Sequence, residues 1–170
     1  VDRTAAIVRD VRSFSHAGDG AAERVDPDES IDRALRMAAH QLPASVRVLR
    51  GSRIEAAVEG VRRELEQVLL NLIVNAAQAL DGEGTIRVGA ALRGAEVVIA
   101  IADDGRGIPP DVIDRIFDPF FTTKPVGEGT GLGLSISHEI VRRHGGRIEV
   151  SSQPDRGTEF RVFLPVPSLP

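Results

Sequence analysis

One stretch, Glu64–Leu80, constrains the fold of this chain more than any other. Val, Leu, Ile and Ala occupy most of its positions, which predicts a helix that is apolar almost all round and therefore buried. At about 100° per residue, the remaining polar side chains fall in one narrow stripe: Glu64, Gln67, Asn71, Asn75 and Gln78. Because burying an amide without a partner is costly, the stripe either bonds to neighbouring groups or faces a polar cleft. Amides four residues apart could also offer oxygens to Mg²⁺, and the helix alone leaves both interpretations open.

The composition excludes several classes of protein. The 170 residues carry a net charge of −4 and include no cysteine, which excludes disulfides and thiolate metal sites. This charge gives no general attraction to nucleic acid or to a membrane surface, and no apolar run approaches the ~20 residues of a membrane span. We therefore predict one compact domain with a short extra element, without nucleic-acid or direct membrane contact. We expect it in the cytoplasm, even if a longer parent protein is membrane-anchored.

The chain mixes helical and extended segments. Residues 1–15 place apolar side chains on one helical face, and the Gly- and Ala-rich residues after them predict a linker. Asp26–Glu29 supplies a helix cap with proline at the first helical position. The later segments predict strands at 46–49, 56–61, 85–92, 96–102, 147–152 and 159–165, a short helix around 112–116 and a longer one at 132–144. This order predicts an α/β two-layer sandwich with a mixed, mostly antiparallel sheet packed on helices, and an N-terminal helix stub.

A Gly-rich loop, Asp103–Pro109, follows one of the predicted strands. Its first aspartate lies at the strand end, where a buried carboxylate could accept a hydrogen bond from an exocyclic amine such as adenine N6. Glycines in such a loop allow a flat ligand to approach the backbone. The same residues would also suit a simple Asx turn, so this loop alone is a weak indication.

A second glycine run, Gly127–Ser135, leads directly into a predicted helix. Free backbone N–H groups and the positive end of the helix dipole would converge there on an anion. The pattern is neither a P-loop nor the dinucleotide fingerprint, and its interspersed leucines argue against a flexible linker. Nearby, Lys124 is the single lysine among 21 basic residues, which suggests a point charge for phosphate unless it is a chance survivor of arginine bias.

These motifs occur in a familiar order. Together with Phe117–Lys124, they resemble the N, first G, F and second G boxes of the sensor histidine kinase catalytic domain, a member of the Bergerat (gyrase, heat-shock chaperone, kinase, MutL) ATP-binding family. The closing Gly157–Phe160 and Leu164-Pro165 also match. The resemblance implies a Bergerat fold over residues 26–166, preceded by the end of a second dimerisation helix (1–17) and a linker (18–25), and followed by a tail (167–170).

The resemblance also implies roles for individual residues. Asn75 would bind Mg²⁺, and Asp103 would accept a hydrogen bond from adenine N6 of ATP or ADP. Lys124 would lie in the lid beside the phosphates, and Thr158 would help to hold adenine through water. The remaining nucleotide-binding positions would be Gln78, Gly105, Gly107, Ile108, Gly129, Thr130, Gly131, Leu132 and Gly133.

Two departures from the family pattern affect the chemistry. Gln78 stands where many of these kinases have a basic residue, so one phosphate contact is either missing or transferred to Lys124. Asn71 stands where hydrolysing relatives have a glutamate base, and an amide cannot accept that proton. We therefore expect ATP binding with poor hydrolysis, and phosphoryl transfer through positioning and Mg²⁺ neutralisation. Asn71, Asn75 and Lys124 are the candidate catalytic residues.

None of the four histidines fits the phosphoacceptor pattern of the family. His138-Glu139-Ile140 imitates it, but Arg143 stands where a proline is expected. We expect His138 to be structural or exposed, His16 to be a solvated cation at a helix end, and His40 and His144 to lie at the surface. The prediction is a protein-histidine kinase domain that does not autophosphorylate alone.

The expected partners follow from the resemblance. They are the protein's own dimerisation domain, which carries the acceptor histidine, and a response regulator receiver domain. The 170-residue chain by itself is expected to be a monomer or weak dimer, and its parent a homodimer. Three alternatives remain: an ATPase of the MutL or gyrase kind, an anti-sigma-type serine kinase, and a silent nucleotide-binding or scaffold module.

Overall fold

A computed structural model of the chain describes residues 20–125 and 129–167. The predicted helix of residues 1–17 with His16, residues 126–128 of the predicted lid and the end of the tail lie outside the described residues. The elements are β1 (Glu23–Val25), α2 (Pro27–Ala38), η1 (Ala39–Gln41), β2 (Val46–Arg50), β3 (Val58–Gly60), α3 (Arg62–Ala79), β4 (Gly84–Arg93), β5 (Glu96–Asp103), η2 (Ile113–Arg115), α4 (Gly133–Arg143), β6 (Arg147–Gln153) and β7 (Gly157–Pro165).

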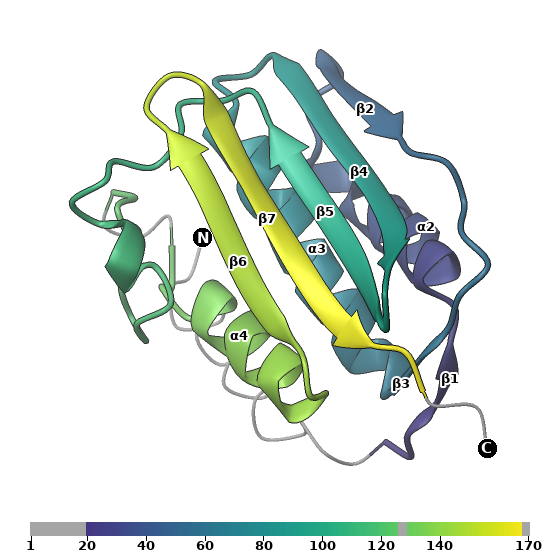
Figure 1. The fold of residues 1–170 in the computed structure, drawn as a ribbon. Helices are drawn as coiled ribbons and strands as arrows, with labels where there is room; N and C mark the ends of the chain where they lie inside the picture. Colours follow the sequence, from purple (N-terminus) through teal and green to yellow (C-terminus); the bar gives the residue numbers. More distant parts are fainter. Residues whose placement is uncertain (1–19, 126–128, 168–170) are drawn as a thin grey trace.

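The architecture is a two-layer sandwich. Five strands form one sheet in the order β2-β4-β5-β7-β6, and α2, α3 and α4 all cover the same face of it (Figure 1). Only the β2–β4 pair is parallel, whereas the other three pairs in this sheet are antiparallel. The predicted α/β sandwich with a mixed, mostly antiparallel sheet is confirmed.

Helix α2 begins as its sequence predicts. The Asp26 side chain accepts hydrogen bonds from the backbone N–H groups of Asp28 at 2.8 Å and Glu29 at 3.3 Å, and Pro27 occupies the first helical turn. These bonds satisfy donors that have no partner inside a helix. The cap therefore sets the start of the helix, so that Ile31 and Ala34 face the core.

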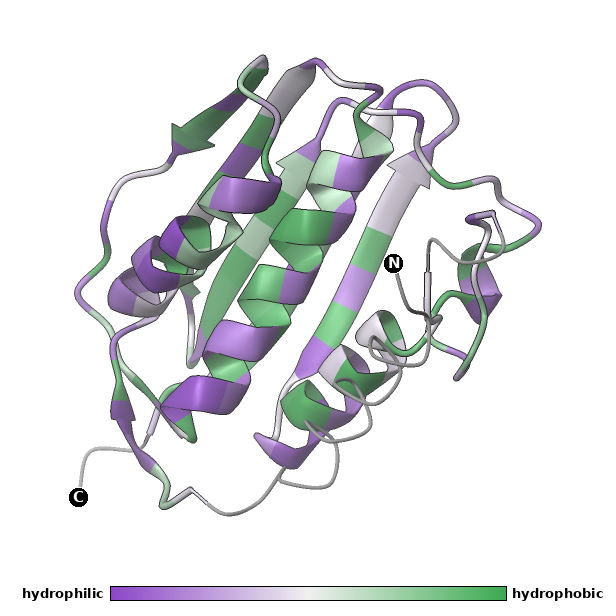
Figure 2. Cartoon of the chain, turned by 180° about the vertical axis from the view of Figure 1, so that it is seen from behind, coloured by the Kyte–Doolittle hydropathy of each residue, from purple (hydrophilic) through white to green (hydrophobic). Residues whose placement is uncertain are grey.

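Helix α3 is the centre of the core. The sheet lies beneath α3, and α2 and α4 lie on either side of it. The helix therefore buries apolar side chains against all three neighbours. Seen from the helix side, α3 shows hydrophobic bands where the outer face of α2 is mostly hydrophilic (Figure 2). Each fully buried aliphatic side chain contributes about 1.5–3 kcal/mol relative to exposure. The buried apolar residues of α3 are Leu65, Val68, Leu69, Leu72, Ile73, Ala76 and Ala77.

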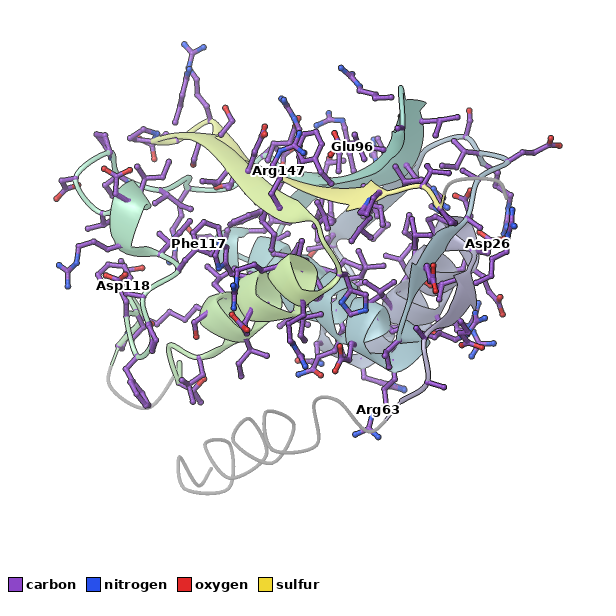
Figure 3. All side chains as sticks on the ribbon, turned by 60° about the horizontal axis from the view of Figure 1, so that its bottom comes forward. Asp26, Arg63, Glu96, Phe117, Asp118 and Arg147 are labelled. Carbon is purple, nitrogen blue, oxygen red and sulfur yellow. The ribbon has the colours of Figure 1, made fainter. Side chains whose placement is uncertain are left out.

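The face of the sheet opposite the helices carries charged side chains over a thin apolar layer. Arg147 lies over the ring of Phe163, with its guanidinium carbon 3.8 Å from the ring centroid, and it pairs with Glu96. Figure 3 shows Arg147 and Glu96 together on this face. The guanidinium therefore covers apolar surface while its charge remains partly in water.

Residues 23–25 form a strand where the sequence predicted a linker. Strand β1 pairs antiparallel with β3, with Glu23 opposite Gly60 and Val25 opposite Val58. Val25 is fully buried. One buried valine among polar neighbours is too short a pattern to predict a strand, because the partner strand that makes the burial possible is distant in sequence.

The prediction for His144 was wrong. Its side chain is only 6% exposed, and its Nε2 accepts a hydrogen bond from the backbone N–H of Val61 at 3.0 Å. Its Nδ1 lies 2.8 Å from the carbonyl oxygen of Ile140 and therefore donates to it. The imidazole thus joins the end of α4 to the start of α3. His40 and His138 are exposed, as predicted.

His144 also borders a cavity at the end of the molecule where β1, β3 and the end of β7 meet. The cavity measures about 410 Å³. Glu64 lies in its wall, with a carboxylate oxygen 3.2 Å from Nη2 of Arg143 and another 3.9 Å from Nδ1 of His144.

Within the described ranges, no helix is long and apolar enough to cross a membrane.

Candidate functional site

A cavity of about 440 Å³ lies at the other end of the helix layer. The second half of α3, the loop after β5, the loop before α4 and the start of β7 form its walls. It collects twelve of the predicted site residues: Asn71, Asn75, Gln78, Asp103, Gly107, Ile108, Lys124, Gly129, Thr130, Gly131, Gly133 and Thr158. Segments far apart in sequence therefore converge on one site.

Two predicted site residues do not line this cavity. Leu132 is buried and is the residue that precedes the first turn of α4. Gly105 faces α3, where a Cβ atom would lie 2.4 Å from the carbonyl oxygen of Ala79. Both residues support the walls of the cavity from behind.

Asp103 forms one end of the site. It is 7% exposed, and its Oδ1 accepts a hydrogen bond from the backbone N–H of Gly105 at 2.9 Å. Burial raises the pKa of this carboxyl, while backbone hydrogen bonds from Gly105 and Thr158 partly oppose the rise and the nearby Asp104 adds to it. The carboxylate is thus held in place by two backbone donors and keeps accepting capacity toward the cavity.

Two glycines, Gly107 in the loop after β5 and Gly157 at the start of β7, are required for a reason that their local sequence does not reveal. Gly107 has a φ of 69°, and a Cβ there would lie 2.1 Å from the carbonyl oxygen of Gln153. At Gly157, whose φ is 90°, a Cβ would lie 1.9 Å from the carbonyl oxygen of Asp103. Glycine is needed at both positions because protein backbones cross closely behind Asp103. The predicted role of the loop glycines toward a flat ligand stays a prediction.

The opposite end of the site is the N-terminus of α4. No side-chain hydrogen bond from the preceding Leu132 caps this helix, so its first backbone N–H groups receive no capping acceptor from that residue. Gly133 and Leu134 line the cavity there. The approach to the helix is fixed by Gly131, whose carbonyl oxygen accepts from the N–H of Phe120 at 2.9 Å. An uncapped helix start that faces a cavity favours an anion.

The two asparagines of α3 differ in their contacts. The side-chain amide of Asn71 donates to Ser137 Oγ on α4 at 2.9 Å, and its oxygen lies so close to Gly133 that a Cβ there would be 2.3 Å away. Asn75, one turn later, lines the cavity and makes no side-chain hydrogen bond within the described residues. Asn71 therefore joins two helices, whereas the amide oxygen of Asn75 is available to a ligand.

Lys124 and Gln78 contact each other. The Lys124 ammonium donates a hydrogen bond to Gln78 Oε1, which links the loop before α4 to the second half of α3. The backbone N–H of Lys124 also bonds to Thr122 Oγ1 at 3.1 Å. A positive charge and the glutamine that replaces the expected basic residue thus lie together in the cavity wall.

The apolar part of the wall was not predicted from the sequence. Val74, Ile116, Phe121, Leu134 and Phe160 contribute to it. Figure 3 shows Phe117 directed toward α4, and its ring centroid lies 5.2 Å from that of His138. The Phe-rich stretch could have indicated this wall, since aromatic side chains often line ligand sites.

Ser152, which lies on β6 behind the cavity, was not predicted either. Its Oγ accepts a hydrogen bond from the backbone N–H of Ile108 at 2.8 Å and lies 2.9 Å from Thr158 Oγ1. Nothing in the local sequence distinguishes this serine from Ser151 beside it, because the contact depends on the pairing of β6 with β7.

No group of three or more His, Cys, Asp or Glu side chains capable of holding a metal ion occurs in the part of the chain that the structure describes. The amide oxygen of Asn75 is a neutral donor in the wall of this cavity that a metal ion could use. Such a donor set fits Mg²⁺ bound mainly by the phosphates of a nucleotide, because Mg²⁺ is often held by few protein oxygens and by substrate phosphates.

Comparison with known proteins shows which family this chain resembles. The family described as histidine kinase-, DNA gyrase B-, and HSP90-like ATPase matches residues 60–168. The sensor histidine kinase ZraS of Escherichia coli (strain K12) is 53% identical over 102 residues, which cover 60% of this chain and 22% of ZraS. The sensor kinase CckA of Brucella abortus (strain 2308) is 44% identical over 117 residues, 60% of this chain and 12% of CckA. The chain thus spans about a fifth or less of these relatives' length.

Solved structures agree with the sequence matches. A mycobacterial sensor histidine kinase, MprB, superimposes with a TM-score of 0.76 at 29% identity over 88% of this chain and all of its own chain. Full-length ShkA in complex with AMPPNP gives a TM-score of 0.82 at 26% identity over 96% of this chain and 36% of its own. The chain therefore belongs to the histidine kinase-, DNA gyrase B- and HSP90-like ATPase family, and its fold is that of sensor histidine kinase catalytic domains.

Proposed function

We propose that this chain is the ATP-binding catalytic domain of a two-component sensor histidine kinase, with residues 26–166 as the catalytic unit. It would transfer the γ-phosphoryl group of ATP to a histidine on the dimerisation domain of the same protein. One observation carries the proposal: a single cavity joins the buried carboxylate of Asp103 to the uncapped start of α4.

The two ends of the cavity suit the two ends of ATP. Asp103 offers a carboxylate oxygen to the amino group of adenine, and Thr158 would help to hold the base through a water molecule. The first N–H groups of α4 and the ammonium of Lys124 offer positive charge to the phosphates. The backbone near the phosphates would be free of side chains at Gly129, Gly131 and Gly133. The base and the phosphates would thus occupy opposite ends of the cavity.

Asn75 is the proposed Mg²⁺ ligand. Its amide oxygen adds no negative charge beside the phosphates, and it has no competing side-chain partner among the described residues. When bound, Mg²⁺ would neutralise charge on the phosphates. The protein's own contribution is to orient the nucleotide and to keep the reacting phosphate in place.

Transfer is favoured over hydrolysis because the position one turn before Asn75 holds an amide. Asn71 cannot act as a general base, and its amide is already bonded to Ser137. Water therefore lacks an activating group at this position. An ATPase of the MutL or gyrase kind is the alternative, and steady-state phosphate release by this chain would favour it.

The proposed partners are the dimerisation domain that carries the acceptor histidine and a response regulator receiver domain. The sensor histidine kinases among the relatives support this assignment. Neither His138 nor His144 is proposed as an acceptor, because Arg143 follows His138 where the acceptor pattern has a proline and both ring nitrogens of His144 are bonded within the domain. We propose a cytoplasmic location and a homodimeric parent protein.

Calorimetric titration with ATP, with and without Mg²⁺, tests the proposal. We expect binding that Mg²⁺ strengthens, no acid-labile phosphate on the chain incubated alone with labelled ATP, and label on a histidine when the parent's dimerisation domain is supplied. The variant Asp103→Ala should lose binding while it keeps its fold by circular dichroism.

Other results would select an alternative. Label on a serine of a partner protein would identify an anti-sigma-type kinase. Nucleotide binding that is indifferent to Mg²⁺, or no binding, would support a silent module. Acid-labile label on the isolated chain would overturn the assignment of its histidines.

A further inference from the structure

The face of the sheet opposite the helices is hollowed near its centre. The hollow measures about 580 Å³ and lies over β4, β5 and β7. Side chains alternate between the two faces of a strand, and the outward positions here hold Gly89, Ala91 and Ala100, whereas the inward Val88 and Ile99 are buried. The same two strands therefore carry large side chains toward the helices and small ones toward the outside.

The backbone does not require these small side chains. The φ of Gly89 is not positive, and a Cβ atom there would lie 3.5 Å from Cα of Gly51, which is an ordinary contact. Glycine and alanine are also depleted in strands relative to β-branched residues. No close backbone approach explains the hollow, in contrast to the crowding that requires glycine at Gly107 and Gly157.

Arginines on β2 and β4 place positive charge beside the hollow. These two strands contain no acidic residue. Arg87 and Arg93 lie on the outer face on either side of Gly89 and Ala91, about 20 Å apart along the strand at 3.4 Å per residue. In the described part of the chain neither arginine makes an ion pair, and the same holds for Arg47 on β2. This side of the hollow therefore carries uncompensated positive charge.

The arginines on the β7 side of the hollow are neutralised. Arg161 pairs with Glu159, and Arg147 pairs with Glu96 while its guanidinium covers the ring of Phe163. Figure 3 shows Arg147 and Glu96 together on this face. The net charge of the whole chain is −4, so the positive charge beside β4 is a local feature of one side of the hollow.

We propose that the hollow, with Arg87 and Arg93 beside it, is a docking surface for an acidic amphipathic segment of a partner protein. A large apolar side chain of that segment would enter the hollow over Gly89 and Ala100, and carboxylates on either side of it would pair with the two arginines. The inference does not depend on nucleotide binding, because none of these four residues lines the cavity that contains Asn75.

The number of arginines favours a protein over a membrane or a nucleic acid. Binding to anionic lipid typically uses clusters of about 4–8 basic residues, and DNA-binding proteins often neutralise about 6–10 phosphates. Only Arg47, Arg87 and Arg93 on this side lack an ion pair among the described residues. A flat lipid surface would also leave the hollow unfilled, whereas a leucine or phenylalanine side chain can anchor in it.

The test uses two synthetic 15-residue peptides that carry leucines on one helical face, flanked by glutamates in one peptide and by lysines in the other. Fluorescence anisotropy with the 170-residue chain should show that the glutamate peptide binds at least about tenfold more tightly, and that salt weakens its binding. Arg87→Glu combined with Arg93→Glu should weaken this binding by about tenfold, the scale of two lost and reversed charge pairs.

Ala100→Leu tests the hollow itself, because it fills the space without a change in charge. It should weaken the glutamate peptide by about tenfold, the lower end of the worth of one buried leucine. Arg36→Glu combined with Arg63→Glu is the matched control, since both arginines are exposed in the helix layer and make no ion pair among the described residues. This control should keep the native peptide affinity, and every variant should keep its circular dichroism spectrum.

Three results would overturn the inference. They are equal binding of the two peptides or of neither, native affinity after the reversal of Arg87 and Arg93, and tighter binding to phosphatidylserine vesicles or duplex DNA than to the glutamate peptide. The last result would assign the surface to another class of partner. Titration of the same proteins with ATP separates this outcome from a failure of the proposed function, because the variants at Arg87, Arg93 and Ala100 should bind ATP as the native chain does.

Discussion

The two ends of α3 carry polar side chains from one stripe, yet they differ in how completely these side chains are bonded. At the first end, the Glu64 carboxylate pairs with Arg143 and lies near His144, whose ring bonds to Val61 and Ile140. At the second end, Asn75 faces a cavity without a side-chain hydrogen bond among the described residues.

The size of the neighbouring cavity does not separate the two ends. It is about 410 Å³ beside Glu64 and about 440 Å³ beside Asn75. The difference lies in bonding capacity that the protein itself leaves unused. The half-buried amide of Asn75 keeps bonding capacity that a ligand can use, whereas the Glu64 carboxylate uses its capacity within the protein through Arg143.

The largest expected effect tests the first end of α3, which we call the closed end because Glu64 is bonded within the protein. Glu64→Ala should destabilise the fold by about 2–3 kcal/mol, because it leaves the charge of Arg143 partly buried without its partner. The value is at or below the range for fully buried pairs because the Arg143 side chain is 33% exposed. Urea unfolding measures the loss, and ATP affinity should not change.

Glu59→Ala is the matched control, since Glu59 lies beside the same cavity but is exposed. It should change stability by no more than about 0.5 kcal/mol. A Glu64→Ala protein of native stability but reduced ATP affinity would reverse the comparison, because the closed end would then belong to the binding site.

The second prediction compares the two asparagines. Asn75→Ala should weaken Mg²⁺-dependent ATP binding by about ten- to a hundredfold, the range for a lost contact at a metal site, with little change in stability. Asn71→Ala should instead cost about 1 kcal/mol of stability through the lost bond to Ser137. Calorimetry and urea unfolding on both variants separate these effects, and equal losses of affinity would remove the distinction between the two residues.

The sequence predicted the parts of the site that depend on local pattern. The amides in the second half of α3, the aspartate at the end of β5 and the glycines before α4 each have a spacing or composition that singles them out, and the structure brings them to one cavity. The cap at Asp26 was predictable for the same reason, because a helix start depends on adjacent residues.

The missed features depend on pairing between distant segments. His144 looks like an ordinary residue at a helix end, and only the approach of β3 and α3 buries its ring. Ser152 acquires its contacts from the register of β6 with β7. Gly105 approaches the backbone of Ala79, a contact that its own loop sequence does not indicate. Local sequence does not contain the positions of such partners.

A third, smaller effect concerns Asp103, which lines the cavity beside the second end of α3. We call this end the open end because Asn75 faces the cavity there. Burial raises the pKa of its carboxyl, so the folded state holds the proton more tightly than the unfolded chain does. The free energy of unfolding should therefore fall as the pH rises from the ordinary aspartate pKa to the raised value, and stay lower above it. Asp103→Asn should abolish this fall and be more stable than the native chain at neutral pH, while ATP binding is lost.

Urea unfolding of both proteins across the acid range measures the difference. Asp81→Asn, which removes one exposed carboxylate after α3, corrects for the change in net charge. A native chain that gains stability over Asp103→Asn as the pH rises would show that the carboxylate is a structural group like Glu64.

The smallest expected effect tests whether Gln78, near the end of α3, lies close enough to the phosphates to change ATP affinity. Gln78 is exposed at the cavity and accepts a hydrogen bond from Lys124, so Gln78→Arg adds a second positive charge near the proposed phosphate position. It should raise ATP affinity by about two- to fivefold at low salt, the scale of one exposed charge pair, and the gain should shrink as salt screens it. Gln67→Arg, in the same stripe but outside the cavity lining, should leave the affinity unchanged. A loss of affinity in Gln78→Arg would mean that repulsion of Lys124 outweighs attraction of phosphate, and that Gln78 serves mainly to hold the lysine.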